Sequence, residues 1–90
     1  MIKYFAIYDN SLQQANPPFA APDEKSAVRM VRNMLVSASD DVFKRVLPVC
    51  DLVYVGSFDD IATKFESPDN KKVVCHLSDI PIPDAPGGTV

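Results

Sequence analysis

The stretch that decides the expected fold is Ile2–Tyr8, Ile-Lys-Tyr-Phe-Ala-Ile-Tyr, which is followed by Asp9-Asn10-Ser11. β-Branched and aromatic residues dominate this stretch, and Asp, Asn and Ser favour turns, so it predicts a strand that ends at a turn. A second run of the same kind, Leu52–Phe58, precedes Asp59-Asp60. The two runs therefore predict the main strands of a sheet.

A helix is predicted between these two strands. Asp23 is suited to be its N-cap, and Glu24 follows in the first turn, where the helix dipole favours a carboxylate. Apolar residues then recur at helical spacing and would form one buried stripe: Ala27, Val31, Met34, Leu35 and Ala38. A second, shorter helix is predicted from Asp40 to Leu47, and Pro48 would end it.

The rest of the chain predicts a loop, two short strands and a tail. Residues 11–22 are expected to be irregular because their three prolines lack backbone donors. The runs Thr63–Glu66 and Lys72–Leu77 predict strands, separated by the turn formers Ser67-Pro68-Asp69-Asn70. Residues 80–90 are rich in Pro and Gly and are expected to be extended or disordered, so residues 1–79 would form a single domain.

The predicted order of elements is β-α-α-β-β-β, which indicates an α+β fold. We expect a single small sheet of three to four strands with the helices on one face. The connection between the first two strands is long enough for a right-handed crossover, so these strands are expected to lie parallel.

Composition limits the classes of partner. The chain has 90 residues, of which 47% are apolar and 23% charged, as in an ordinary globular domain. Its net charge is −3, and residues 51–90 hold three Lys/Arg against seven Asp/Glu, which gives −4. This charge counts against DNA binding, and any nucleic-acid contact would have to use a local patch.

Location and redox state also follow from the sequence as expectations. No apolar run reaches the length of about 20 residues that a membrane span needs, so no membrane partner is expected. Without a secretory signal the protein is expected in a reducing cytoplasm, with Cys50 and Cys75 as free thiols; a disulfide between them is the alternative.

No catalytic or metal-binding motif is present in the sequence. There is no P-loop, no G-x-G-x-x-G and no pair of carboxylates on a rigid element. His76 follows Cys75 within a predicted strand, so the two side chains would point to opposite faces and could not share a metal ion. We therefore expect no enzyme activity, no cofactor and no small-molecule substrate, and a structural role for His76.

The first predicted helix carries a candidate nucleic-acid surface. Lys25, Arg29 and Arg32 are spaced i, i+4 and i+7, so they would line one exposed ridge, which Lys44 and Arg45 would extend from the second helix. The alternatives are a solvated helix face and a ridge that contacts phosphates.

Aromatic residues form a second candidate surface. Residues alternate along a strand, so one face of the sheet would pack under the helices through Phe5, Ile7, Val53 and Val55. The opposite face would then carry Tyr4, Tyr8, Tyr54 and Phe58. Such a face serves either to stack unpaired bases or to form a dimer interface.

Three stretches of the chain carry recognisable patterns. They are Lys3–Asp9, as Lys-x-Phe-x-x-Tyr-Asp; Pro17–Pro22, as Pro-Pro-Phe-x-x-Pro; and Asp51–Asp59, an acidic residue before a strand that ends Gly-x-Phe-Asp. In this order they resemble the small nonstructural protein of gokushovirus-type microviruses, which are tailless single-stranded DNA phages. The resemblance implies a protein encoded beside the replication protein and described as DNA-binding or replication-accessory.

Two functional hypotheses follow. The first is a non-enzymatic phage accessory protein that binds single-stranded DNA during genome replication or packaging. The second is a homodimeric protein-interaction module that engages a phage or host protein, which the acidic residues 51–90 favour.

Overall fold

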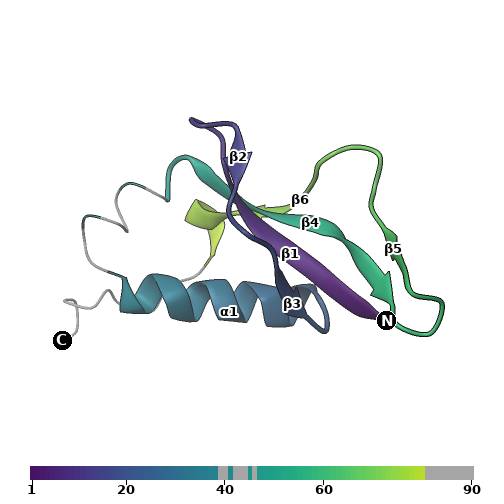
Figure 1. Cartoon of the computed structure of the whole chain (residues 1–90). Helices are drawn as coiled ribbons and strands as arrows, with labels where there is room; N and C mark the ends of the chain where they lie inside the picture. Colours follow the sequence, from purple (N-terminus) through teal and green to yellow (C-terminus); the bar gives the residue numbers. More distant parts are fainter. Residues whose placement is uncertain (39–40, 42–44, 46, 81–90) are drawn as a thin grey trace.

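The computed structural model describes residues 1–38, 41, 45 and 47–80 (Figure 1). This part of the chain holds six strands, one α-helix and one 3-10 turn. In chain order they are β1 (Ile2–Asp9), β2 (Gln14–Ala15), β3 (Phe19–Ala21), α1 (Glu24–Ser37), β4 (Cys50–Asp59), β5 (Lys64–Glu66), β6 (Lys72–His76) and η1 (Leu77–Asp79).

The protein is mostly β, so the expected α+β fold with three to four strands is wrong. All six strands join one curled antiparallel sheet, and α1 lies along one side of it (Figure 1). The prediction that residues 11–22 are irregular is wrong. β2 and β3 form there on either side of Pro17 and Pro18, so neither proline has to donate a ladder hydrogen bond.

The central pair of strands, β1 and β4, is antiparallel rather than parallel as expected. Its register runs from Ile2 opposite Phe58 to Asp9 opposite Cys50. β3 pairs antiparallel with β1 and returns the chain to the start of that strand, with Lys3 opposite Ala21. The helix then carries the chain to the other end of β1, and from that end β4 can only run back antiparallel.

Two short strands flank each central strand. β2 and β3 pair with opposite ends of β1, and β6 and β5 pair with opposite ends of β4. β5 and β6 confirm the two later strands that the sequence predicted.

The structure confirms the first predicted helix, which is α1. Asp23 caps it, because its carboxylate accepts a hydrogen bond from the Ser26 backbone N–H at 2.8 Å. The buried stripe consists of Ala27, Val31 and Leu35, whereas Met34 is exposed. The second helix that the sequence predicted lies largely on residues 39–40, 42–44 and 46, outside the described residues. No helix in the described part of the chain is long and apolar enough to cross a membrane.

The core lies between α1 and the sheet. Its largest fully buried side chains are Phe5, Leu35, Leu52 and Leu77. Ile80 also belongs to it, with only 5% of the residue exposed, although the sequence assigned it to the tail. Residues 81–90 are outside the described part, and the division at residue 79 stays a prediction.

A β-bulge in β4 decides which residues of that strand face the helix. The pairing with β1 shifts by one, so that Tyr4 is opposite Gly56 but Phe5 is opposite Tyr54. The residue between them, Val55, is therefore the extra one, and the alternation of β4 reverses across it. Leu52 and Tyr54 pack against the core under α1. Val53 is also buried, with only 5% of the residue exposed, but its partners Ala6 and Val73 place it on the other face of the sheet. The expectation that Val53 and Val55 would pack under the helices is therefore wrong.

The loops that follow β1 and β4 have the same design. Asp9 accepts hydrogen bonds from the backbone of Ser11 and Leu12 at 2.9 and 3.2 Å. Asp59 accepts from the backbone of Ile61 and Ala62 at 3.0 and 3.1 Å, which confirms it as a turn former. Each loop ends on a left-handed residue, at position 13 in the first and position 63 in the second.

Candidate nucleic-acid interface

One face of the sheet carries no helix in the described part of the chain, and we call it the open face (Figure 1). Its side chains are identified by register, because residues that pair across strands point to the same side. They are Ile2, Tyr4, Ala6 and Tyr8 from β1, Asp51, Val53, Gly56 and Phe58 from β4, Phe65 from β5, and Val73 and His76 from β6.

One end of the open face is aromatic. Phe58 is opposite Phe65 in the β4–β5 ladder, and the Tyr4 and Phe65 ring centroids are 5.7 Å apart. Phe65 nevertheless remains 49% exposed. It also lies over Gly56, where an added Cβ would be 2.4 Å from the Glu66 backbone oxygen and 2.6 Å from the Phe65 ring. The glycine therefore lets this ring approach the backbone of β4 closely.

The other end of the open face is polar. Tyr8, Asp51 and His76 form a row across β1, β4 and β6. His76 Nδ1 donates to Asp51 Oδ1 at 2.6 Å, and Asn10 Nδ2 donates to Asp51 Oδ2 at 3.0 Å. The Asp51 side chain is only 9% exposed, whereas that of His76 is 63% exposed. A buried carboxylate thus holds an exposed imidazole.

The same contacts shift the pKa values of both groups. Burial acts to raise the pKa of the Asp51 carboxyl, but hydrogen bonds from Asn10 and His76 outweigh it and lower that pKa. The hydrogen bond from His76 to Asp51, and the charge of that carboxylate, raise the pKa of the imidazole. Asp51 is therefore ionised at neutral pH, and the proton on His76 Nδ1 is fixed by it.

Two adjacent lysines go to opposite sides of the sheet. The Lys71 ammonium lies 4.0 Å from the centroid of the Tyr8 ring, on the open face. The Lys72 ammonium lies 5.7 Å from the Tyr54 ring, which packs against the core through Phe5. Only the first lysine adds a cation to the open face.

The structure brings together three of the four aromatic residues that the sequence grouped. Tyr4, Tyr8 and Phe58 share the open face. Tyr54 does not, because the bulge turns it toward Phe5, with ring centroids 5.5 Å apart.

The basic residues of α1 lie on the side of the helix near η1. Lys25, Arg29 and Arg32 line a shallow depression of about 190 Å³ together with Val28 and Ile80. No described carboxylate is within ion-pair distance of these three cations. Glu24 directly precedes Lys25 and Asp79 directly precedes Ile80, however, so carboxylates adjoin this depression along the chain. The surface is therefore of mixed charge.

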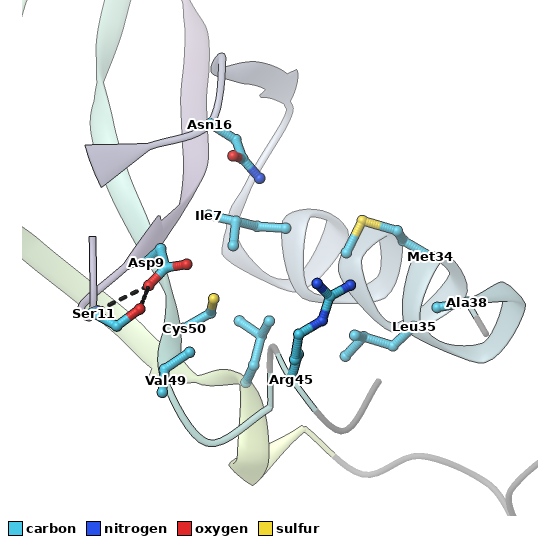
Figure 2. A pocket seen from close by; sticks show the side chains of 11 residues that line it. Ile7, Asp9, Ser11, Asn16, Met34, Leu35, Ala38, Arg45, Val49 and Cys50 are labelled. Atoms are coloured by element: carbon cyan, nitrogen blue, oxygen red, sulfur yellow. Dashed lines mark hydrogen bonds between the residues drawn. The ribbon is translucent and has the colours of Figure 1, made fainter. Parts of the chain in front are cut away.

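The other two predicted cations do not extend this surface in the described structure. Lys44 is outside the described residues. Arg45 instead lines a cavity of about 490 Å³ between α1 and the ends of β1 and β4 (Figure 2).

This cavity is mostly apolar. Ile7, Met34 and Leu35 are among its lining residues, and Asp9 is engaged with Ser11 at its edge (Figure 2). Cys50 is at the same site, but burial raises the pKa of its thiol, so it stays protonated and weakly nucleophilic at neutral pH. Both cysteines are free thiols, as expected. Among the described residues, no group of three His, Cys, Asp or Glu could hold a metal ion.

Sequence reasoning missed four residues that give the open face its charged groups and one of its rings: Asp51, Phe65, Lys71 and His76. Phe65 could have been assigned to this face from the alternation of side chains in the predicted strand Thr63–Glu66. The pairing of Asp51 with His76 has no sequence signal, because it depends on the register of two strands 25 residues apart. The expectation that Cys75 and His76 face opposite sides is confirmed, since they pair with Leu52 and Asp51 respectively.

Comparison with known proteins gives one match. The model of the family described as "Phage ORF5 protein" matches residues 2–80. No curated protein and no solved structure matches the chain. Because the family model covers most of the chain, this protein belongs to the Phage ORF5 protein family.

Proposed function

We propose that this phage protein is a non-enzymatic accessory factor that binds single-stranded DNA on the open face of its sheet. The single observation that carries the proposal is the composition of that face. It has half-buried and exposed aromatic rings, two groups that can carry positive charge, and no carboxylate without a partner among the described strand residues. Unpaired bases stack on such rings, and each stacked base contributes about 1–3 kcal/mol.

Charge explains why this face is preferred over the rest of an acidic protein. The strand carboxylates Asp9, Asp59 and Glu66 lie on the helix side by register. Asp51 is on the open face, but its two oxygens accept from His76 and Asn10. A phosphate chain that crosses the open face would therefore meet Lys71 and His76 and avoid most of the repulsion expected from a net charge of −3.

The proposed biological setting is the replication or packaging of a single-stranded DNA phage genome. Membership of a phage family supports a phage protein. The motifs Lys3–Asp9, Pro17–Pro22 and Asp51–Asp59 support the finer proposal that the phage is a gokushovirus-type microvirus.

A ring-specific variant tests the proposal. Replacing Tyr4 and Phe65 by Leu keeps apolar cover over the sheet but removes the π-faces. We expect binding of a labelled oligo(dT) to weaken by at least about 1 kcal/mol, as measured by fluorescence anisotropy. Met34→Leu is the matched control, because Met34 is equally exposed on the helix side. Absence of oligo(dT) binding by the wild-type protein at low salt would reject the proposal.

A homodimer is the second candidate function, and exposed apolar residues of the same face favour it. Ile2, Phe65 and Val73 are all exposed on this face, and exposed apolar residues on one sheet face commonly mark an interface. Sedimentation of the wild-type protein would then give twice the monomer mass. The Leu variant should preserve such a dimer, whereas Phe65→Asp should dissociate it, so the two candidates separate.

A further inference from the structure

We propose that His76 and Lys71 form a phosphate-contacting pair on the open face, with Asp51 as the positioning residue that orients the imidazole. This inference rests on the proposed function and adds to it the residues that hold the DNA backbone. It also makes the affinity depend on pH near neutrality.

The first step is the orientation of the imidazole. An ionised carboxylate only accepts hydrogen bonds, so the contact of 2.6 Å requires a proton on His76 Nδ1. The second oxygen of Asp51 is occupied by Asn10, which also donates from its side chain and its backbone to the Val49 carbonyl, at 2.9 Å in each case. The loop thus locks the carboxylate, and the carboxylate locks the ring.

The second step concerns the ring atom of His76 that remains available to a ligand. The His76 side chain is 63% exposed, and its Nδ1 is in use, so Nε2 is the ring atom available to a ligand. In the charged ring Nε2 carries a proton and can donate to a phosphate oxygen. In the neutral ring Nε2 carries a lone pair instead of a proton, so it cannot donate a hydrogen bond to a phosphate oxygen. Phosphate contact at Nε2 therefore requires protonation of His76, and a bound phosphate in turn favours that protonation.

The third step is the neighbouring cation. Lys71 is held over Tyr8, which is next to Asp51 in the β1–β4 ladder. The charged groups that act on His76 or Asp51 are Lys71 before β6 and Asp79 of η1, besides the pair itself. Asp51 and Asp79 both raise the pKa of the imidazole, which brings its protonation closer to neutral pH. Lys71 lies over the ring of Tyr8, and His76 is at the other end of the row Tyr8, Asp51 and His76, so one face of the sheet offers two cations to a phosphodiester chain whose base is stacked nearby.

The test is a titration of oligo(dT) binding at constant ionic strength from about pH 5.5 to about pH 9, a range that spans imidazole titration. Wild-type affinity should fall as pH rises through the raised pKa of His76. His76→Gln should weaken binding about three- to tenfold at the acid end, equal the wild type at the alkaline end, and show no pH dependence over this range.

The two adjacent lysines supply the matched comparison. Lys71→Gln should weaken binding at every pH and reduce the log–log salt slope by about 0.7. Lys72→Gln should leave both unchanged, because Lys72 lies beside Tyr54 on the helix side. Circular dichroism checks that each variant is folded.

The possible failures are distinguishable. If wild-type protein binds oligo(dT) but His76→Gln keeps the wild-type affinity and pH dependence, the phosphate pair is rejected and the proposed function stands. Equal effects of the Lys71 and Lys72 variants would also reject the pair. If the wild-type protein does not bind oligo(dT) at any pH in the range, both the pair and the proposed function are rejected.

Discussion

The two faces of the sheet are built from the same strands and the same kinds of residue, yet they differ in how far their aromatic rings are buried. On the helix side Phe5 is fully buried, and its ring contacts Phe19 and Tyr54 at centroid distances of 6.3 and 5.5 Å. On the open face the neighbouring ring, Tyr4, contacts Phe65, which stays half exposed. Cover by α1 makes one set of rings part of the core, whereas the other set keeps part of its surface exposed.

The largest expected difference between the faces is in stability. Phe5→Ala should reduce the free energy of unfolding by about 3–5 kcal/mol, because it removes a fully buried ring and leaves a cavity. Phe65→Ala should cost about 1 kcal/mol or less, since this ring is already half in water. Urea denaturation measures both, and similar losses would mean that the open face is covered in solution.

A second test compares two isoleucines. Ile80→Ala should cost about 2–4 kcal/mol, because Ile80 is 5% exposed within the core. Ile61→Ala is the matched control and should cost almost nothing, because Ile61 is 93% exposed. If thermal denaturation shows no difference between them, the folded unit ends at residue 79, as the sequence suggested.

The third test concerns the glycine under Phe65. Gly56→Ala should destabilise the protein by about 1–3 kcal/mol, because the new Cβ would be 2.4 Å from a backbone oxygen and β5 would have to move. The loss should be local, with faster amide exchange in β5 than in β1. Uniform exchange rates across both strands would contradict this explanation.

A smaller effect should appear in the pH dependence of stability. The raised pKa of His76 means that its contribution is complete below the ordinary imidazole value of about 6.5 and is lost as pH rises through the folded-state value. The lowered pKa of Asp51 acts at the other end, since its contribution is lost as pH falls through the folded-state value. The thermal midpoint of the wild-type protein should therefore decline at mildly alkaline pH, and that of His76→Gln should not.

The smallest effect is expected on the helix. Replacing Arg29 and Arg32 by Gln should leave oligo(dT) affinity and its salt dependence nearly unchanged, because these residues are on the opposite side of the sheet from the rings. Gln is also a good helix former, so the fold should be kept. A salt slope that flattens by about 1.4 would show instead that the α1 ridge is the phosphate surface.

The local features of the chain were predictable from its residues. The strand Ile2–Asp9, the cap at Asp23 and the buried helix stripe all follow from signals within a few residues of each other. The basic ridge and three of the four aromatic residues on the open face follow from the same periodicities. The short strands β2 and β3 did not, because their pairing with β1 outweighs the prolines between them.

By itself, the sequence determined the two long strands, the two later strands and the first helix, and that no familiar catalytic motif is present. The tertiary structure decided which side chains meet. One extra residue at Val55 reverses the alternation of β4, sends Tyr54 to the core and leaves Asp51 on the open face. The register between β4 and β6 then places His76 beside that carboxylate. Periodicity is a property of neighbouring residues, whereas bulges and register depend on contacts between distant strands, so only the folded chain assembles this surface.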